Sequence, residues 1–267
     1  MDKGQLLRKI TADEDERLTL ARLLDQWERA QRRNIPASTP FLSPREQSLG
    51  RALLEQLGAA EDGVAFAGGY EGAERRVALF LPDYLAAEDY ASDAEYPICA
   101  VRCTFREEDQ PTHRDFLGSL MGLGLRRNVL GDLLITAGNC DILLRREMLP
   151  FVLQNYTGAG RTHLKVAEVP LGNLHLPEQK RREIRDTVAT LRLDSVLSSA
   201  FRISRTRAAE LIRAGRVEIN WQPCEKADRL CAQGDVLTAR GLGKCTLAEV
   251  GGLSKKGRVT IRLERYQ

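Results

Sequence analysis

The sequence contains no apolar run long enough to cross a bilayer. Its longest uncharged stretch is the thirteen residues Met148–Gly160, and this stretch includes Pro150, Gln154 and Asn155. A membrane span needs roughly 20 predominantly apolar residues. The N-terminus has no apolar signal core, and the acidic run Asp13–Glu16 is unlike an organelle transit peptide. We therefore predict a soluble, cytoplasmic protein with no membrane contact.

Cysteine and histidine are too few and too scattered to predict a metal site or a nucleophile motif. The chain has six cysteines and three histidines, and no two cysteines form a C-x-x-C pair. Cys99 and Cys103 fall on the same face of a predicted strand, and no second pair has a suitable spacing. We predict buried or incidental thiols, with no metal and no cofactor.

The length of the chain indicates the number of compact units, and its charge distribution indicates a class of partner. The 267 residues correspond to two or three compact units. Residues 1–180 contain 22 Lys or Arg against 27 Asp or Glu, whereas residues 181–267 contain 18 against 10. A basic C-terminal third on a mildly acidic body indicates a module that binds a polyanion, with nucleic acid as the first candidate. An ordinary solvated basic surface is the alternative.

Two helices and a hairpin are predicted in the N-terminal region. Residues 12–33 carry apolar side chains at three-residue steps, with acids at the start and bases at the end, as in a helix whose charges complement its dipole. Ser43 is a candidate N-cap for a second helix that ends near Leu57, with Gly58 closing it. Residues 64–81 contain two apolar runs around a glycine-rich turn, which predicts a β-hairpin.

Strands and helices alternate over residues 60–175, which favours a small α/β middle domain. The predicted fold class is therefore α+β or mixed α/β, in several domains. The predicted domains are a helical and hairpin N-terminal region at 1–85, the middle domain at 86–180 and a C-terminal module at 181–267. The elements predicted in the middle domain are strands at 97–105, 130–135, 141–144 and 162–169 and a helix at 113–125.

The basic C-terminal module has the clearest local signals. The charged segment 178–190 is predicted to be helical and to join the module to the body. Asp194 is a candidate cap for a short helix, Ser204 for a second one, and Gly215 can close the second helix in the left-handed conformation. The elements predicted after the joining segment are a short helix that follows Leu191–Asp194 and runs through Ala200, a helix at 205–214 and strands near 217–220 and 234–237.

Arginines cluster around the second of these helices. On a helical wheel, Arg205 and Arg216 project within roughly 20° of each other, and Arg213 lies about 80° away. Arg202 lies just before the helix, where free amides and the helix dipole favour a phosphate group. Because a guanidinium can donate two parallel hydrogen bonds to phosphate oxygens, these four arginines form a plausible phosphate clamp. A solubilising helix face is the alternative interpretation.

Four short motifs follow one another in this segment, which are R-L-D at 192–194, S-R-x-x-A at 204–208, L-I-x-x-G-x-V-x-I-N at 211–220 and G-D at 234–235. In this order they resemble the S-four domain, an RNA-binding module named after ribosomal small-subunit protein four. The resemblance implies two helices and a small β element, with RNA held on the basic face of the helix pair. The residues that it implies as RNA contacts are Arg192, Arg202, Ser204, Arg205, Arg207, Arg213 and Arg216. On the wheel, Arg207 points away from the others.

The rest of the chain contains four further motifs, which are the segment 113–120, G-L-G-L-R-R at 122–127, L-G-D at 130–132 and F-L-S-P-R-E-Q at 41–47. Together they resemble the YlmH family. It implies an RNA-binding protein associated with the large ribosomal subunit and with stalled peptidyl-tRNA complexes. Some members of the family carry labels that link them to cell division or to photosystem II.

An RNA-modifying enzyme that docks through its S-four domain is the competing hypothesis. A pseudouridine synthase needs a catalytic aspartate in its own core domain, whereas Asp194 belongs to the S-four start. A methyltransferase needs a glycine-rich loop directly after a strand, but Gly122–Gly124 follows a predicted helix. Arg126 and Arg127 beside that glycine turn fit a second phosphate contact better.

The sequence thus predicts a non-catalytic protein that binds rRNA or tRNA on the large ribosomal subunit. No catalytic residue is assigned. A scaffold that contacts protein partners through the acidic body is a third possibility, and it is compatible with RNA binding. The sequence does not indicate an oligomeric state.

Overall fold

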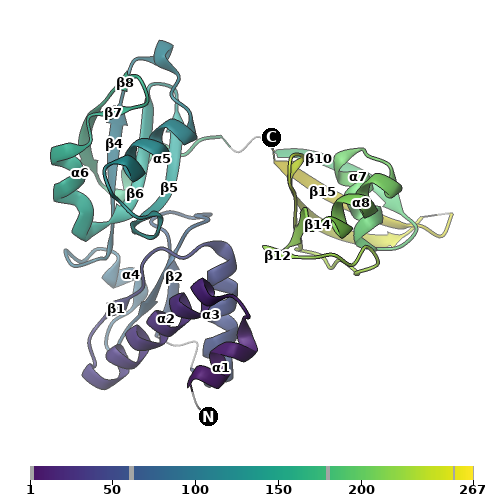
Figure 1. Cartoon of the computed structure of the whole chain (residues 1–267), viewed down its shortest axis with the longest axis horizontal. Helices are drawn as coiled ribbons and strands as arrows, with labels where there is room; N and C mark the ends of the chain where they lie inside the picture. Colours follow the sequence, from purple (N-terminus) through teal and green to yellow (C-terminus); the bar gives the residue numbers. More distant parts are fainter. Residues whose placement is uncertain (1–2, 60–62, 179–180, 255, 267) are drawn as a thin grey trace. The chain divides into compact units, whose positions relative to one another are not determined.

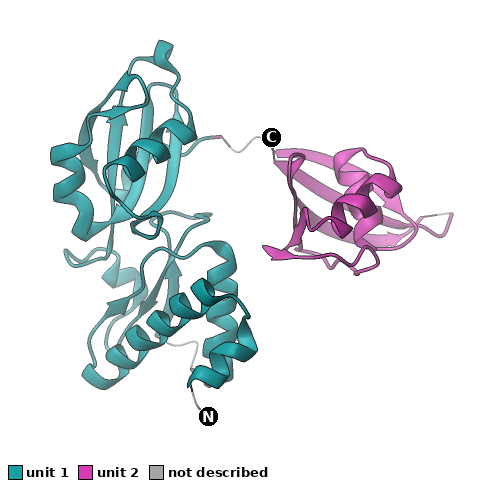
Figure 2. Cartoon of the chain, viewed as in Figure 1, with its two compact units in different colours: residues 1–177 teal, residues 178–267 magenta. Residues whose placement is uncertain are grey.

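The chain folds into two compact units. The computed structural model describes residues 3–59, 63–178, 181–254 and 256–266. Residues 1–177 form the first unit and residues 178–267 the second (Figure 2). No described helix combines the length and the apolar composition that a bilayer span requires.

Local signals determine where the long N-terminal helix begins and ends. α2 (Glu14–Arg33) follows Asp13, whose carboxylate accepts a hydrogen bond from the backbone N–H of Glu16. Asn34 ends the helix in the left-handed conformation, with φ of 51°. The predicted helix at 12–33 is confirmed, and α1 (Lys3–Ile10) precedes it.

The next helix, α3 (Pro44–Gln56), begins with a capping box. The Ser43 hydroxyl accepts a hydrogen bond from the N–H of Glu46, and the Glu46 carboxylate accepts one from the N–H of Ser43. Gly58 follows the end of the helix with a φ of 64°. The predicted start and end of this helix are both confirmed.

A small antiparallel sheet packs against these helices (Figure 1). β2 (Val64–Ala67) and β3 (Val77–Phe80) form the predicted hairpin. β1 (Ala37–Ser38) pairs with the other edge of β3, so the strand order is β1-β3-β2. The sequence analysis missed β1, because two residues in a proline-rich connector show no strand periodicity.

A second antiparallel sheet, ordered β5-β6-β4-β9, occupies the rest of the first unit. Its strands are β4 (Ile98–Thr104), β5 (Leu130–Thr136), β6 (Asn139–Arg145) and β9 (Lys165–Val169). The first three predicted strands are confirmed, and the fourth, at 162–169, is divided at Leu164 into β8 and β9. The predicted helix at 113–125 is α5 (His113–Gly122). α6 (Leu149–Asn155) was not predicted. The short elements are α4 (Ala87–Tyr90), β7 (Gly158–Ala159), β8 (Thr162–His163) and the 3₁₀ turns Glu107–Asp109, Arg127–Val129, Arg146–Met148 and Leu171–Asn173.

One hydrophobic cluster joins the N-terminal region to this sheet. Phe41 and Leu79 pack in the same buried cluster as Ile98 and Leu143. Arg145 reinforces the junction, because its guanidinium donates hydrogen bonds to the Ser38 hydroxyl (2.8 Å) and the Thr39 carbonyl (3.0 Å). Residues 1–177 therefore form one compact unit, and the predicted domain boundary at 85/86 stays a prediction.

The second unit begins with a strand where a helix was predicted. β10 (Arg181–Val188) pairs antiparallel with β15 (Val259–Tyr266) along its whole length. The helical prediction for 178–190 was therefore wrong over the strand, and residues 179–180 lie outside the described residues. The charges of this segment project from a strand at the edge of the sheet. Its partner β15 lies at the opposite end of the unit's sequence, so no local signal indicates the pairing.

The remaining elements complete a six-stranded antiparallel sheet with two helices. The order of the sheet is β10-β15-β14-β13-β11-β12. The helices α7 and α8 and the strands of the sheet enclose a core that includes Val196, Ile212 and Leu263. The mixed α and β fold class is confirmed. The bounds are α7 (Leu193–Phe201), α8 (Arg205–Arg213), β11 (Val217–Ile219), β12 (Gln222–Pro223), β13 (Val236–Ala239) and β14 (Gly243–Leu253).

Candidate nucleic-acid interface

The turn between α7 and α8 brings Arg202 and Ser204 to the junction of the two helices. Arg202 ends α7 with a left-handed backbone, at a φ of 54°. The Ser198 hydroxyl donates a hydrogen bond to the carbonyl of Ile203 (2.6 Å). The Ser204 hydroxyl caps α8 by accepting a hydrogen bond from the N–H of Arg207 (3.1 Å), as predicted. These bonds close the turn on both sides and leave the Arg202 side chain exposed.

α8 has one buried face and one basic face. Ala208 and Ile212 are fully buried in the core. Arg205, Arg207 and Arg213 are exposed. The helix therefore contributes packing through its small and aliphatic residues and presents its arginines to solvent.

The end of α8 corrects the wheel argument for Arg216. The helix stops at Arg213, and Gly215 adopts the predicted left-handed conformation, with φ of 64°. The N–H of Arg216 then donates to the carbonyl of Leu211 (3.0 Å), and the N–H of Gly215 donates to that of Ile212 (3.0 Å). This Schellman closure places Arg216 beyond the helix, so a helical projection does not give its direction. Its guanidinium donates to the carbonyl of Arg240 (3.2 Å).

Asp194 does not cap α7, which corrects a second prediction. It is the second residue of the helix, and the N-cap is Arg192. The N–H groups of Leu193 and Asp194 instead donate to the carbonyls of Arg229 (2.8 Å) and Ala227 (3.1 Å). A loop from a distant part of the sequence thus satisfies the first turn, and the carboxylate is left for other contacts.

The Asp194 carboxylate binds two of the predicted arginines. Arg192 donates from Nε and Nη2 to its two oxygens, both at 3.2 Å, and Arg205 donates from Nη2 at 3.0 Å. The Asp194 side chain is 9% exposed. Burial acts to raise the pKa of Asp194, but the hydrogen bonds from Arg192 and Arg205 outweigh it and hold this pKa below its ordinary value. The carboxylate therefore orients two guanidinium groups at the start of the helix pair.

The other predicted arginines differ in how far the fold already uses them. Among the described residues, the guanidinium groups of Arg202 and Arg213 have no hydrogen-bond or ion-pair partner. Arg207 pairs with Glu210 on the helix surface (2.9 Å). Because exposed ion pairs contribute little to stability, the Arg207 pair does not prevent a ligand contact. Arg202 and Arg213 are the most available cations of the set.

Arg126 and Arg127 lie in the first unit and differ from each other. Arg126 is exposed. Arg127 is partly buried, and its Nη1 donates to the carbonyls of Leu130 (2.8 Å) and Gly131 (3.0 Å). Burial lowers the pKa of Arg127 to about 10. The Arg127 guanidinium is thus bonded to backbone carbonyls a few residues further along the chain, and Arg126 is the arginine of this pair that faces solvent.

The sequence analysis missed Arg258, which precedes β15. Its guanidinium donates from Nε to the Thr187 hydroxyl (3.1 Å) and from Nη2 to the Thr187 carbonyl. This contact connects the start of β15 to the end of β10. The only available signal was the basic turn Lys256-Gly257-Arg258, which is far in the sequence from the arginines of α7 and α8.

The cysteines are thiols of the core. Cys99, Cys103, Cys140, Cys231 and Cys245 are buried, and Cys224 is partly exposed. Burial raises the pKa of Cys231 and Cys245 to about 12. The prediction of buried or incidental thiols agrees with these positions.

Two protein-family models match the chain. The first is described as "Putative RNA-binding domain in YlmH" and matches residues 95–173. The second, the S4 domain, matches residues 191–237. The chain is also 35% identical over 256 residues to "Ribosome-associated protein quality control protein P2" of Bacillus subtilis (strain 168), covering 95% of this chain and 96% of the relative. The chain belongs to the YlmH family.

The second unit of this YlmH-family chain contains the S4 match, and residues 178–267 are called the S4 unit from here on. A solved structure, "Cell division protein ylmH from Streptococcus pneumoniae", matches with a TM-score of 0.49 and 19% identity. It covers 61% of this chain and 95% of the solved chain.

Proposed function

We propose that this YlmH-family chain is a non-catalytic RNA-binding protein whose main contact is the arginine set of α7 and α8. The observation that carries this proposal is the group of exposed guanidinium groups around the turn at Arg202 and along α8, within the stretch that matches the S4 domain. The proposed RNA contacts are Arg192, Arg202, Ser204, Arg205, Arg207, Arg213 and Arg216.

The chemistry of the set favours recognition of the RNA backbone. A guanidinium donates two parallel hydrogen bonds to phosphate oxygens and stays charged at physiological pH. Folded and double-stranded RNA is recognised mainly through its shape, its phosphates and its 2′-hydroxyls. We therefore expect contact with structured RNA and little base specificity from these arginines.

The proposed place of action is the large ribosomal subunit in the cytoplasm. The name of the Bacillus subtilis relative describes a ribosome-associated protein of protein quality control. On this basis we propose that the chain contacts rRNA or tRNA on the large subunit and takes part in handling stalled peptidyl-tRNA. Arg126, which is exposed in the first unit, is proposed as a second phosphate contact. Arg127 is proposed to contribute to the same contact, although its guanidinium also bonds to the carbonyl of Leu130.

A double variant at the C-terminal end of α8 tests the RNA interface. We expect Arg213→Gln with Arg216→Gln to weaken binding to a hairpin RNA about tenfold and to make the log–log salt dependence shallower by about 1.5, because two phosphate contacts are lost. Fluorescence anisotropy over a salt series measures both quantities. Neither guanidinium is buried, so the variant should unfold at the same urea concentration as the wild type.

The matched control removes the same charge elsewhere. Arg22 and Arg29 are exposed on α2 and lie seven residues apart, on one helix face. Arg22→Gln with Arg29→Gln should leave both the affinity and the salt slope unchanged. If both double variants weaken binding equally, net charge alone attracts the RNA and the proposed interface is wrong.

The ribosomal location has its own test. We expect the protein in a cell lysate to sediment with free large subunits at low salt and to be released at high salt, and crosslinking should map the contacts to rRNA or tRNA. A protein that stays at the top of the gradient at all salt concentrations contradicts the ribosomal proposal.

The non-catalytic part of the proposal is supported by the two matched family models. One is described as a putative RNA-binding domain and the other as the S4 domain. Mass spectrometry of total rRNA and tRNA nucleosides checks it. We expect identical nucleoside profiles with and without the gene, and a modified nucleoside that disappears on deletion would support a modifying enzyme.

A further inference from the structure

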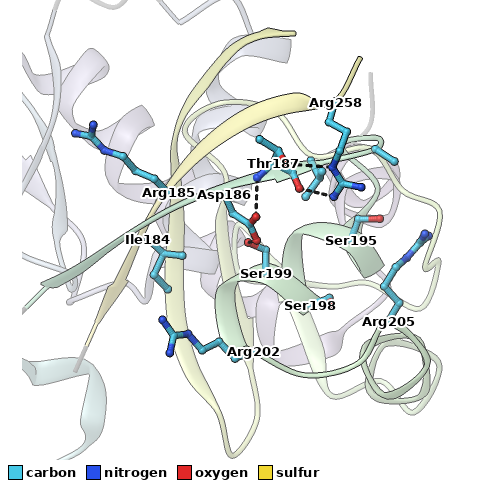
Figure 3. Close-up of a pocket in the computed structure, with 12 residues that line it drawn as sticks. Ile184, Arg185, Asp186, Thr187, Ser195, Ser198, Ser199, Arg202, Arg205 and Arg258 are labelled. Carbon is cyan, nitrogen blue, oxygen red and sulfur yellow. Dashed lines mark hydrogen bonds between the residues drawn. The ribbon is translucent and has the colours of Figure 1, made fainter. Parts of the chain in front are cut away.

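The S4 unit contains a pocket that is lined mostly by residues outside the proposed RNA contacts. It lies between β10 and α7 and has a volume of about 370 Å³ (Figure 3). Residues of β10, α7 and the segment before β15 line it, and so do Arg202 and Arg205. The pocket therefore opens beside the helix pair that we propose as the RNA interface.

Besides one arginine of β10, three arginines from other segments line this pocket. Arg202 follows α7, Arg205 begins α8 and Arg258 precedes β15. Two of them are held in place by the fold, Arg205 through Asp194 and Arg258 through Thr187. Each still has N–H groups that these bonds do not use, since a guanidinium carries five N–H donors. The pocket therefore has unused cationic donors along its lining.

Asp186 gives the pocket an acceptor among these cations. Its Oδ2 accepts a hydrogen bond from the Ser199 hydroxyl (2.6 Å), and its Oδ1 accepts one from the N–H of Thr187 (2.7 Å). Within the described residues, no Lys or Arg forms an ion pair with Asp186. A carboxylate has about four acceptor positions, so two remain for a donor from outside the protein.

Aliphatic side chains add an apolar wall. Ile184 and Val188 of β10 line the pocket, and Ala189 follows them. Val188 is 4% exposed, so this wall is continuous with the core of the unit. An occupant with a flat apolar face could pack there.

We propose that this pocket binds one unpaired nucleotide of the RNA, with its phosphate on the arginines and its base edge on Asp186. The volume is at the lower end of the range for ligand pockets and exceeds what a phosphate group alone fills. A nucleotide combines an anion, a flat face and donor groups, and unpaired bases are the parts of RNA that a protein can accommodate singly. The inference rests on the proposed RNA-binding function and adds a preference for RNA with an extrahelical base.

The carboxylate predicts which base the pocket favours. Cytosine presents an amino donor at N4, which an aspartate can accept, whereas the N3–H donor of uracil lies between two carbonyl oxygens that repel a carboxylate. The pocket should therefore prefer an unpaired cytosine over an unpaired uracil, and Asp186→Ala should remove that preference.

The test compares two hairpin RNAs that are identical except for one unpaired cytosine in the stem. We expect the full-length wild type to bind the bulged hairpin about tenfold more tightly than the fully paired one, the effect of one charge-assisted hydrogen bond. Ala189→Phe fills the pocket without changing the charge, and it should abolish the tenfold difference while leaving the affinity for the paired hairpin unchanged. Ala232→Phe, at an exposed position of the same unit that does not line the pocket, is the matched control and should keep the difference.

The outcomes separate the two proposals. If the wild type binds neither hairpin, the proposed function is wrong. If it binds both hairpins equally and Ala189→Phe changes nothing, the function stands and the pocket proposal is overturned. Should Ala189→Phe fail to fold, Arg258→Gln replaces it. Arg258→Gln should weaken binding of the bulged hairpin about tenfold more than binding of the paired one, and equal weakening contradicts the proposal.

Discussion

Two arginines of the first unit and two arginines of the S4 unit occupy opposite environments. In the first unit, Arg127 and Arg145 are partly buried and donate to backbone carbonyls, and burial lowers the pKa of both. In the S4 unit, Arg202 and Arg213 are exposed and have no partner among the described residues. At these positions a guanidinium is a structural crosslink in the first unit and an available ligand group in the S4 unit.

The difference follows from what surrounds each guanidinium. Arg75 donates to the carbonyls of Phe41 (3.0 Å) and Leu130 (3.1 Å), so it connects the N-terminal region to β5. Removing Arg75 takes this donor away from the carbonyl of the buried residue Phe41, which costs stability. Removing Arg202 or Arg213 leaves nothing unsatisfied, so only binding should change. Charge counts alone do not distinguish these two uses.

The largest effect is expected where an ion pair in the first unit is broken. The Asp141 carboxylate is fully buried and accepts from Arg102 Nε and Nη2 (both 2.7 Å) and from the N–H of His175 (2.7 Å). We expect Asp141→Ala to lower the free energy of unfolding by about 3–5 kcal/mol. Urea denaturation measures this, with Asp109→Ala at an exposed position as the control. A loss no larger than that of the control would contradict the structural role of this pair.

The next effect concerns Asp194 and has a defined pH dependence. The pKa of Asp194 is lower in the folded state than its ordinary value of about 3.9. The ionised carboxylate therefore stabilises the fold above about pH 4, and this stabilisation is lost as the pH falls through the lower folded-state pKa. Asp194→Asn should cost about 1–3 kcal/mol at pH 7 and should reduce the loss of stability between pH 5 and pH 2. Urea midpoints measured across this pH range check the prediction, and parallel curves for variant and wild type would contradict it.

Arg202→Gly should separate folding from binding. The left-handed backbone at Arg202 is unfavourable for arginine and acceptable for glycine, so the variant should be as stable as the wild type or up to about 1 kcal/mol more stable. The affinity for hairpin RNA should fall about fivefold to tenfold, because the most available guanidinium is lost. Parallel denaturation and anisotropy measurements test both parts. Unchanged affinity in the folded variant would remove Arg202 from the interface.

The smallest effect is expected at Arg207. Its ion pair with Glu210 joins two exposed side chains on one helix, and such pairs contribute about 0.3–0.5 kcal/mol. We expect Arg207→Gln to change the free energy of unfolding by no more than this amount and the RNA affinity by less than about twofold. Urea denaturation and anisotropy measure the two quantities. An effect on affinity equal to that of Arg202→Gly would place Arg207 among the main contacts.

Sequence and structure agree where the deciding contacts are local. The caps at Ser43 and Ser204 and the left-handed closure at Gly215 each involve near neighbours in the sequence, and all three are confirmed. Two predictions were wrong where the deciding contacts come from residues far away in the sequence. The segment 181–188 is a strand because it pairs with β15, and Asp194 is no cap because the carbonyls of a distant loop satisfy the first turn of α7.

The candidate site also has features that the sequence predicts and features that depend on distant contacts. The order of motifs along the chain was sufficient to identify the S4 helix pair and its arginines. It could not reveal that Arg258 lines the same pocket as Arg202 and Arg205, since the segment before β15 is far from both helices in the sequence. It also could not reveal that the Arg127 guanidinium donates to the carbonyls of Leu130 and Gly131.

The sequence by itself determined the ends of the capped helices, the net positive charge of the C-terminal third and the family to which the chain belongs. These properties depend on residue identity and on short spacings. Only the tertiary structure decided the strand at 181–188, the carboxylate that orients Arg192 and Arg205, and the pocket between β10 and α7. The physical reason is that these features depend on pairing and burial between segments far apart in the chain, which local propensity does not encode.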